Sequence, residues 1–158
     1  MEQQRMSNQL RALTDRADIT SLVDRWLASL DDRRFDAGWA RSMFTEDIRS
    51  EDPMGEHVGI AGHLESMRKL LVMFERTQHV GMNHIIDLDG DVARVRWNSI
   101  NTHVLASQGG AEESERLFTS GGHFDADVVR TAEGWRFQRM SLHVTWTSGE
   151  PPVLPADA

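Results

Sequence analysis

The chain of 158 residues contains no cysteine and no tyrosine. Without cysteine it can form no disulfide and can supply neither a thiolate ligand for zinc nor a thiol nucleophile. Without tyrosine it has no phenol to act as an acid, a base or an oxyanion donor. Any such role must therefore fall on other side chains.

The chain also has few basic residues, 17 Lys and Arg against 25 Asp and Glu, for a net charge of −8. This balance argues against nucleic acid or a membrane as the partner, because both are bound through basic surfaces. No apolar run is long enough to span a bilayer, and the N-terminus lacks the apolar core of a secretory signal. We therefore expect one cytoplasmic domain.

The first half of the chain reads as helical. We expect a polar, flexible segment at 1–12 and then a helix capped by Thr14 with Asp15 or Asp18, ending at Asp31. Its apolar stripe is Ile19, Leu22, Val23, Trp26, Leu27 and Leu30. Asp36 should cap a short second helix, and a third is expected over 59–76.

The second half has the alternating, β-branched pattern of strands, expected at 48–52, 79–88, 92–105, 116–129 and 135–146. Turns are expected at Asp89-Gly90 and Glu133-Gly134, and a flexible acidic loop at 107–115. The order of elements predicts an α+β fold, with a curved antiparallel sheet wrapped on N-terminal helices. We assign 13–148 to one domain and 149–158 to a tail.

Asp31 and His79 are the first candidates for chemistry. A carboxylate that holds one ring nitrogen of a histidine fixes its tautomer and makes the other nitrogen a general base. The simpler alternative is that Asp31 is a solvated turn residue. His103 joins them only if the hairpin register allows it: a three-residue loop at 89–91 puts His79 and His103 on one face, and a two-residue loop puts them on opposite faces.

Other polar residues are weaker candidates. His123 and Asp125 share one face of a strand, and Arg130 ends it, but such groups are more often surface residues. His57, His63 and His143 read as satisfied or surface histidines. In the last strand, large apolar residues occupy odd positions up to 137 and even positions from 140 onward. This switch predicts a bulge near residues 138–139. The spacings His57 to His63 and His79 to His84 do not suit a metal, so we expect no metal and no cofactor.

Four segments together resemble the SnoaL-like proteins of the nuclear transport factor 2-like superfamily. They are 16–31 (RADITSLVDRWLASLD), 44–47 (FTED), 77–93 (TQHVGMNHIIDLDGDVA) and 122–137 (GHFDADVVRTAEGWRF). The resemblance covers about residues 12–148. It implies a cone-shaped α+β barrel with a deep pocket, assembled as a homodimer or homotrimer, and it is nearest the scytalone dehydratase and hexachlorocyclohexane dehydrochlorinase branch.

The resemblance implies that Asp31 orients His79, which removes a proton from a small-molecule substrate. It places His103, His123, Asp125 and Arg130 among substrate-binding or charge-stabilising residues. Since the tyrosines of those enzymes are missing, His103, His123, Arg130 or an indole N–H, from Trp26 or Trp97, would have to replace them.

We therefore expect a cofactor-independent lyase or isomerase of the dehydratase type. The alternatives are a non-catalytic ligand-binding or structural subunit, like the dioxygenase beta chains of the same fold, and a polyketide-type cyclase. Assembly is also expected from an apolar strip on the outside of the sheet, formed by Met82, Ile86, Met140, Leu142 and Trp146.

Overall fold

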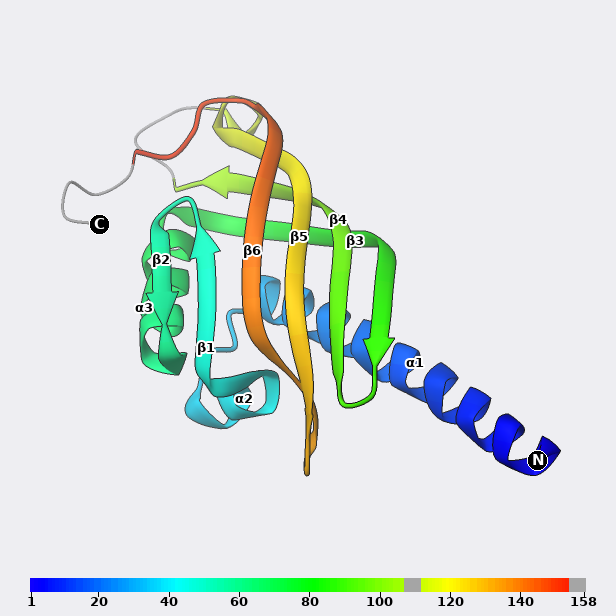
Figure 1. Cartoon of the computed structure of the whole chain (residues 1–158). Helices are drawn as coiled ribbons and strands as arrows, with labels where there is room; N and C mark the ends of the chain where they lie inside the picture. The colour runs from blue at the N-terminus through cyan, green and yellow to red at the C-terminus, as the bar shows by residue number, and fades with distance from the viewer. Residues whose placement is uncertain (107–111, 154–158) are drawn as a thin grey trace.

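The computed structural model describes residues 1–106 and 112–153. Three helices, a 3-10 turn and six strands follow one another along the chain (Figure 1). The helices are α1 (Glu2–Asp32), α2 (Ala37–Met43) and α3 (Gly59–Leu71), and the turn is η1 (Glu113–Arg116). The strands are β1 (Phe44–Asp52), β2 (Gly55–Val58), β3 (Phe74–Asp89), β4 (Val92–Leu105), β5 (Leu117–Thr131) and β6 (Gly134–Ser148).

The strands form one curved sheet in the order β2-β1-β6-β5-β4-β3. The α+β prediction is confirmed, with two refinements. The sheet is not closed into a barrel, because β2 and β3 are its edges in the described ranges. It is also not wholly antiparallel, since β1 runs parallel to β6.

The sheet has an inner face, which α1 and α3 cover, and an outer face, which Figure 1 shows toward the viewer. The first half of β3 crosses behind β5 and β6 and then turns to run beside β4 (Figure 1). The helix lies very close at this bend: a Cβ on Gly81 would be 2.5 Å from Leu27 Cδ1. A larger residue there would require the Leu27 side chain to shift.

An aromatic cluster fills the middle of the inner face. Trp26 of α1 meets the rings of Trp97 and Phe124 edge-on, and Trp97 stacks on Phe124 at 5.0 Å. Phe137 of β6 packs against both indoles. The stripe of α1 predicted from periodicity is buried, from Ile19 to Leu30. This core fixes the sheet on the helix that carries Asp31.

Several boundaries differ from expectation. Helix α1 starts at Glu2 rather than after residue 12. Thr14 does not cap it, because its hydroxyl bonds back to the carbonyl of Leu10, as hydroxyls do in a helix interior. Asp15 is buried in an ion pair with Arg130. The cap by Asp36 is confirmed, with the Trp39 N–H donating to its carboxylate at 2.8 Å.

The expected bulge in the last strand is confirmed: Val128 pairs with Phe137 and Asp127 with Arg139, which leaves Gln138 extra. The bulge keeps both Phe137 and Met140 in the core. The predicted outer apolar strip is therefore wrong for Met140 and Ile86, which are buried, while Trp146 is 47% exposed. Assembly stays a prediction.

Among the described helices, none is long and apolar enough to cross a membrane. The third helix ends at Leu71, five residues earlier than expected, and β3 begins at Phe74. The short strand β2 was not anticipated. Most of the expected acidic loop, 107–111, and the end of the tail lie outside the described residues.

Candidate functional site

Asp31 and His79 meet where α1 ends against β3. The helix stops because Arg33 adopts a left-handed conformation, with φ of 56°. The Arg33 guanidinium then donates to the carbonyls of Leu71 and Phe74 at 2.6 and 3.0 Å. The end of α1 is thus tied to the turn that leads into β3, and this tie places Asp31 beside the strand.

The Asp31 carboxylate accepts three hydrogen bonds from β3. The His79 ring nitrogen Nδ1 lies 2.7 Å from Oδ1, the Thr77 hydroxyl donates to Oδ1 at 2.9 Å, and the His79 backbone N–H donates to Oδ2 at 3.0 Å. Burial alone would raise the pKa of Asp31, but these bonds and the charge of His79 outweigh it, and the pKa is lowered. Asp31 is therefore an ionised acceptor at neutral pH.

An ionised acceptor at Nδ1 requires that this nitrogen carry a proton. Neutral His79 is then the Nδ1–H tautomer, and its Nε2 holds a free lone pair. The His79 side chain is only 8% exposed. A buried histidine with a free Nε2 and a carboxylate behind it has the arrangement of a general base.

His79 and His103 lie on the same face, although the hairpin loop is short. Asp89 pairs with Val92, which leaves a two-residue loop, and this alone would separate the histidines. The register then shifts between Met82 and Ile85, where Asn83 adopts φ of 58°. This bulge changes the parity, so that His79 pairs with Asn101, two residues from His103.

His103 lies edge-on to His79, with ring centroids 5.5 Å apart. Burial, together with repulsion from His79, lowers the pKa of His103 to about 4. Its Nδ1 lies 3.1 Å from the carbonyl oxygen of Phe118, so the neutral ring donates there and presents a bare Nε2. In this form His103 accepts hydrogen bonds rather than stabilising an oxyanion.

Asn101 is an inner-face residue beside His79 that the sequence reasoning missed. It is the register partner of His79 and is 4% exposed. The Ser99 hydroxyl donates to its Oδ1 at 2.6 Å, which leaves the amide NH₂ as a donor beside the dyad. The sequence did contain a signal for Asn101: it is a polar residue at the same alternating positions as Val95, Trp97 and His103.

Trp26 and Trp97 belong to the buried aromatic cluster. Both indole N–H groups are buried with no hydrogen-bond partner among the described residues. An unpaired buried donor costs free energy. These two N–H groups, like that of Trp135, are unpaired donors in the core of the described residues.

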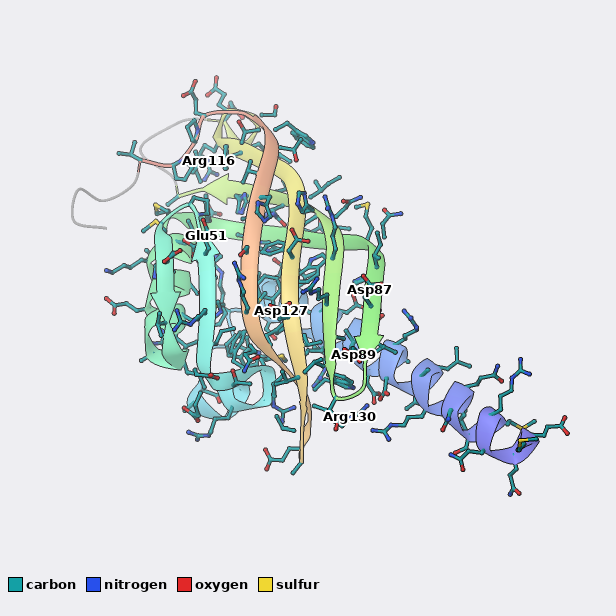
Figure 2. All side chains as sticks on the ribbon, in the orientation of Figure 1. Glu51, Asp87, Asp89, Arg116, Asp127 and Arg130 are labelled. Carbon is teal, nitrogen blue, oxygen red and sulfur yellow. The ribbon has the colours of Figure 1, made fainter. Side chains whose placement is uncertain are left out.

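The structure does not bring His123, Asp125 or Arg130 to this site. His123 and Asp125 pair in register with Asn98 and Arg96, whose side chains are on the outer face. Arg130 forms ion pairs with Asp15 at 2.7 Å and Asp91 at 2.8 Å and lies over the Trp135 ring. Figure 2 shows it at the hairpin end of the sheet. Strand parity places His123 and Asp125 on the face opposite the dyad, whereas Arg130 lies at the far, hairpin end of β5 against Asp15, so the expectation that they lie beside the dyad is wrong.

His63 of α3 is a further buried histidine. Its Nδ1 lies 2.7 Å from the Ser50 hydroxyl, and its Nε2 has no partner in the described residues. Burial lowers the pKa of His63 to about 4. The sequence reading of His63 as a satisfied histidine therefore holds for one ring nitrogen only.

The chain belongs to the SnoaL-like domain family, whose model matches residues 11–141. Among proteins similar in sequence is the uncharacterized protein Rv2910c of Mycobacterium tuberculosis. It is 29% identical over 132 residues, which are 80% of this chain and 83% of that protein. The predicted family is confirmed.

Solved structures of the same fold include a type 2 hexachlorocyclohexane dehydrochlorinase, LinA, at 19% identity and a TM-score of 0.77, covering 94% of this chain and 97% of that one. A provisionally named scytalone dehydratase of Novosphingobium aromaticivorans has 20% identity and a TM-score of 0.76, covering 93% and 96%. A nuclear transport factor 2-like protein of Salmonella enterica has 18% and 0.71, covering 87% and 96%. These likenesses show the shared fold alone.

Proposed function

We propose that the protein is a cofactor-independent lyase or isomerase in which His79, oriented by Asp31, is the general base. The observation that carries the proposal is the set of three hydrogen bonds that fix Asp31 against β3 and engage Nδ1 of His79, so that Nε2 is the ring nitrogen left to accept a proton. Two proteins of the same fold are named for elimination reactions, a dehydrochlorinase and a dehydratase.

In the proposed reaction, His79 Nε2 removes a proton from a carbon next to an electron-withdrawing group. The electron pair of the C–H bond forms the new double bond. In an elimination, the bond to a β leaving group, hydroxide or halide, breaks at the same time or afterwards. In an isomerisation, His79 returns the proton to another carbon.

Negative charge that develops on the substrate needs hydrogen-bond donors, and the inner face supplies neutral ones. We assign this role to the Asn101 amide and to the indole N–H groups of Trp26 and Trp97. His103 Nε2, as an acceptor, suits a substrate hydroxyl. These groups replace the tyrosine phenols that the chain lacks.

The second candidate is a non-catalytic member of the family. The aromatic cluster of Trp26, Trp97, Phe124 and Phe137 supports it, because these rings fill the inner face where a substrate would lie. A catalytic protein has to admit its substrate between this cluster and His103.

The test begins by identifying what the protein binds, by mass spectrometry of molecules that copurify with it. Activity or deuterium exchange at the acidic carbon is then followed by NMR in D₂O for the wild type, His79→Ala and Asp31→Asn. His84→Ala is the matched control, since His84 is also paired with a carboxylate, Asp24, at 3.6 Å. Exchange that survives in both dyad variants would overturn the general-base proposal and favour the binding function.

A further inference from the structure

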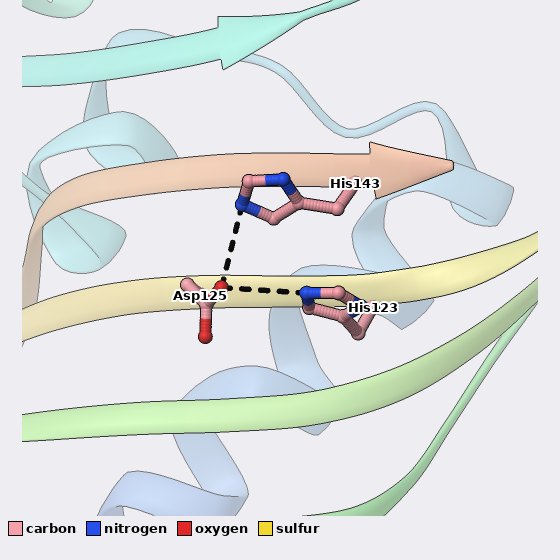
Figure 3. Close-up of side chains that lie close together, drawn as sticks. All are labelled: His123, Asp125 and His143. Atoms are coloured by element: carbon pink, nitrogen blue, oxygen red, sulfur yellow. Dashed lines mark ion pairs between the residues drawn. The ribbon is translucent and has the colours of Figure 1, made fainter. Parts of the chain in front are cut away.

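His123, Asp125 and His143 gather on the outer face of the sheet, away from the dyad (Figure 3). Asp125 lies two residues after His123 on β5, so both side chains point to the same side. His143 on β6 is the register partner of His123. Two neighbouring strands therefore present three ligand-type side chains at one place.

The three side chains converge on one oxygen. His123 Nε2 lies 3.4 Å and His143 Nε2 3.3 Å from the same Asp125 Oδ2. The two imidazole rings are stacked, with centroids 4.8 Å apart and an angle of 21° between their planes. All three ligand atoms fall within 4.8 Å of one another.

Within the described residues, the contacts of His123 and His143 with Asp125 do not have hydrogen-bond geometry. The two Nε2 atoms are therefore not held by hydrogen bonds to the carboxylate. Asp125 has no other ion-pair partner in that part of the chain, and Arg96, opposite it on β4, does not pair with it. All three side chains remain available to a ligand.

From these contacts we propose that His123, Asp125 and His143 form a binding site for a divalent transition-metal ion, with Zn²⁺ as the ion that this ligand set suits. Two imidazoles and a carboxylate are ordinary zinc ligands, and tetrahedral ligands about 2.05 Å from zinc are about 3.3 Å apart. The distances from Asp125 Oδ2 to Nε2 of His123 and of His143, 3.4 and 3.3 Å, already match this ligand-to-ligand separation.

The remaining adjustment is small. The two ring nitrogens must approach one another, and His143 has room to turn, because its side chain is 50% exposed. Asp125 and His143 also line a groove of about 430 Å³ on the outer face, together with Glu51, Asp87, Arg94, Arg96, Asp127, Arg139 and other residues. A water molecule would complete the coordination there and leave the ion exchangeable.

The site would join β5 to β6, since its ligands come from both strands. An ion that binds only the folded protein raises the melting temperature by mass action. This role is independent of the proposed general-base chemistry, which lies on the inner face.

The test uses the full-length protein after treatment with a chelator. Zn²⁺ binding is measured by competition with a chromophoric chelator, and Co²⁺ serves as a spectroscopic substitute that reports tetrahedral coordination. We expect about one ion per chain, with His143→Ala and the isosteric Asp125→Asn each weakening affinity at least about tenfold. Circular dichroism verifies that both variants fold.

His84→Ala and His79→Ala are the controls, because each removes a histidine that lies beside a single aspartate elsewhere in the fold. Both should bind Zn²⁺ as the wild type does. Three results would overturn the proposal: no wild-type binding tighter than about 0.1 mM, unchanged affinity in His143→Ala and Asp125→Asn, or loss of binding in His79→Ala, which would move the ion to the dyad.

Discussion

The two faces of the sheet use the same pair of residue types, histidine and aspartate, in opposite settings. On the inner face, Asp31 receives three hydrogen bonds, and the His79 side chain is 8% exposed. On the outer face, Asp125 makes only loose contacts with His123 and His143 and is 49% exposed. Burial and hydrogen bonding, rather than residue type, therefore distinguish the proposed base from the proposed metal ligands.

The largest difference should appear in activity. His79→Ala should lower the rate of a confirmed reaction by about 10²–10⁴, the contribution of a positioned base. Asp31→Asn should fall in a similar range, because the amide can hold the ring in the wrong tautomer. Steady-state kinetics measures both. His143→Ala on the outer face should keep the wild-type rate, and an equal loss there would erase the distinction between the faces.

Substitutions on the two faces should also differ in their effect on the free energy of unfolding. Trp97→Ala removes a fully buried ring from the aromatic cluster and should lower the free energy of unfolding by about 3–5 kcal/mol. Arg96→Ala, the adjacent position on the outer face, has no ion-pair partner among the described residues and should change it by less than about 0.5 kcal/mol. Urea unfolding checks both. Similar values would mean that the inner cluster is loosely packed.

The inner histidines should also make the protein sensitive to acid. The pKa values of His63 and His103 are about 4 in the folded chain, below the ordinary 6.5. The unfolded state therefore takes up protons first, and stability is lost as the pH falls from about 6.5 toward 4. For His63 the loss is of the order of 3 kcal/mol.

Urea unfolding at several pH values between 8 and 4 measures this loss, with His63→Asn as the variant. The variant should be less stable at pH 8 but should show a shallower fall with acid, since it has one histidine fewer to protonate on unfolding. A fall as steep as in the wild type would mean that His63 is protonated in the folded chain.

Much of the inner face could be predicted from the sequence. The stripe Ile19 to Leu30 follows helical periodicity, and Asp31 and His79 follow from their positions in the family pattern. The pairing of His79 with Asn101 could not, because it depends on the bulge at Asn83, and no turn motif marks that residue. Loop length alone gives the wrong parity.

The outer cluster was missed for a related reason. His143 is 20 residues from His123, and only the register of β5 with β6 brings them together. That register includes a shift between Gly121 and Gly122 and another at Gln138, so residue spacing in the sequence does not reveal it. The family resemblance had placed His123 and Asp125 in the pocket, whereas the register puts them on the outer face.

The bulge offers the smallest and most local test. Asn83→Val places a β-branched side chain at a left-handed φ of 58° and should cost about 1–2 kcal/mol of stability. Asn83→Gly should be nearly neutral, since glycine adopts that conformation freely. Thermal unfolding compares the two variants. Equal stability would mean that the bulge is absent in solution and that His79 has another partner on β4.

The central claim is that Asp31 holds the proton on Nδ1 of His79 and leaves Nε2 free to accept one. Long-range ¹H–¹⁵N NMR of the labelled protein at neutral to mildly basic pH reports directly which ring nitrogen of each histidine carries the proton. We predict the Nδ1–H form for His79 in the wild type and its loss in Asp31→Asn. A His79 ring protonated at Nε2 in the wild type would contradict the claim.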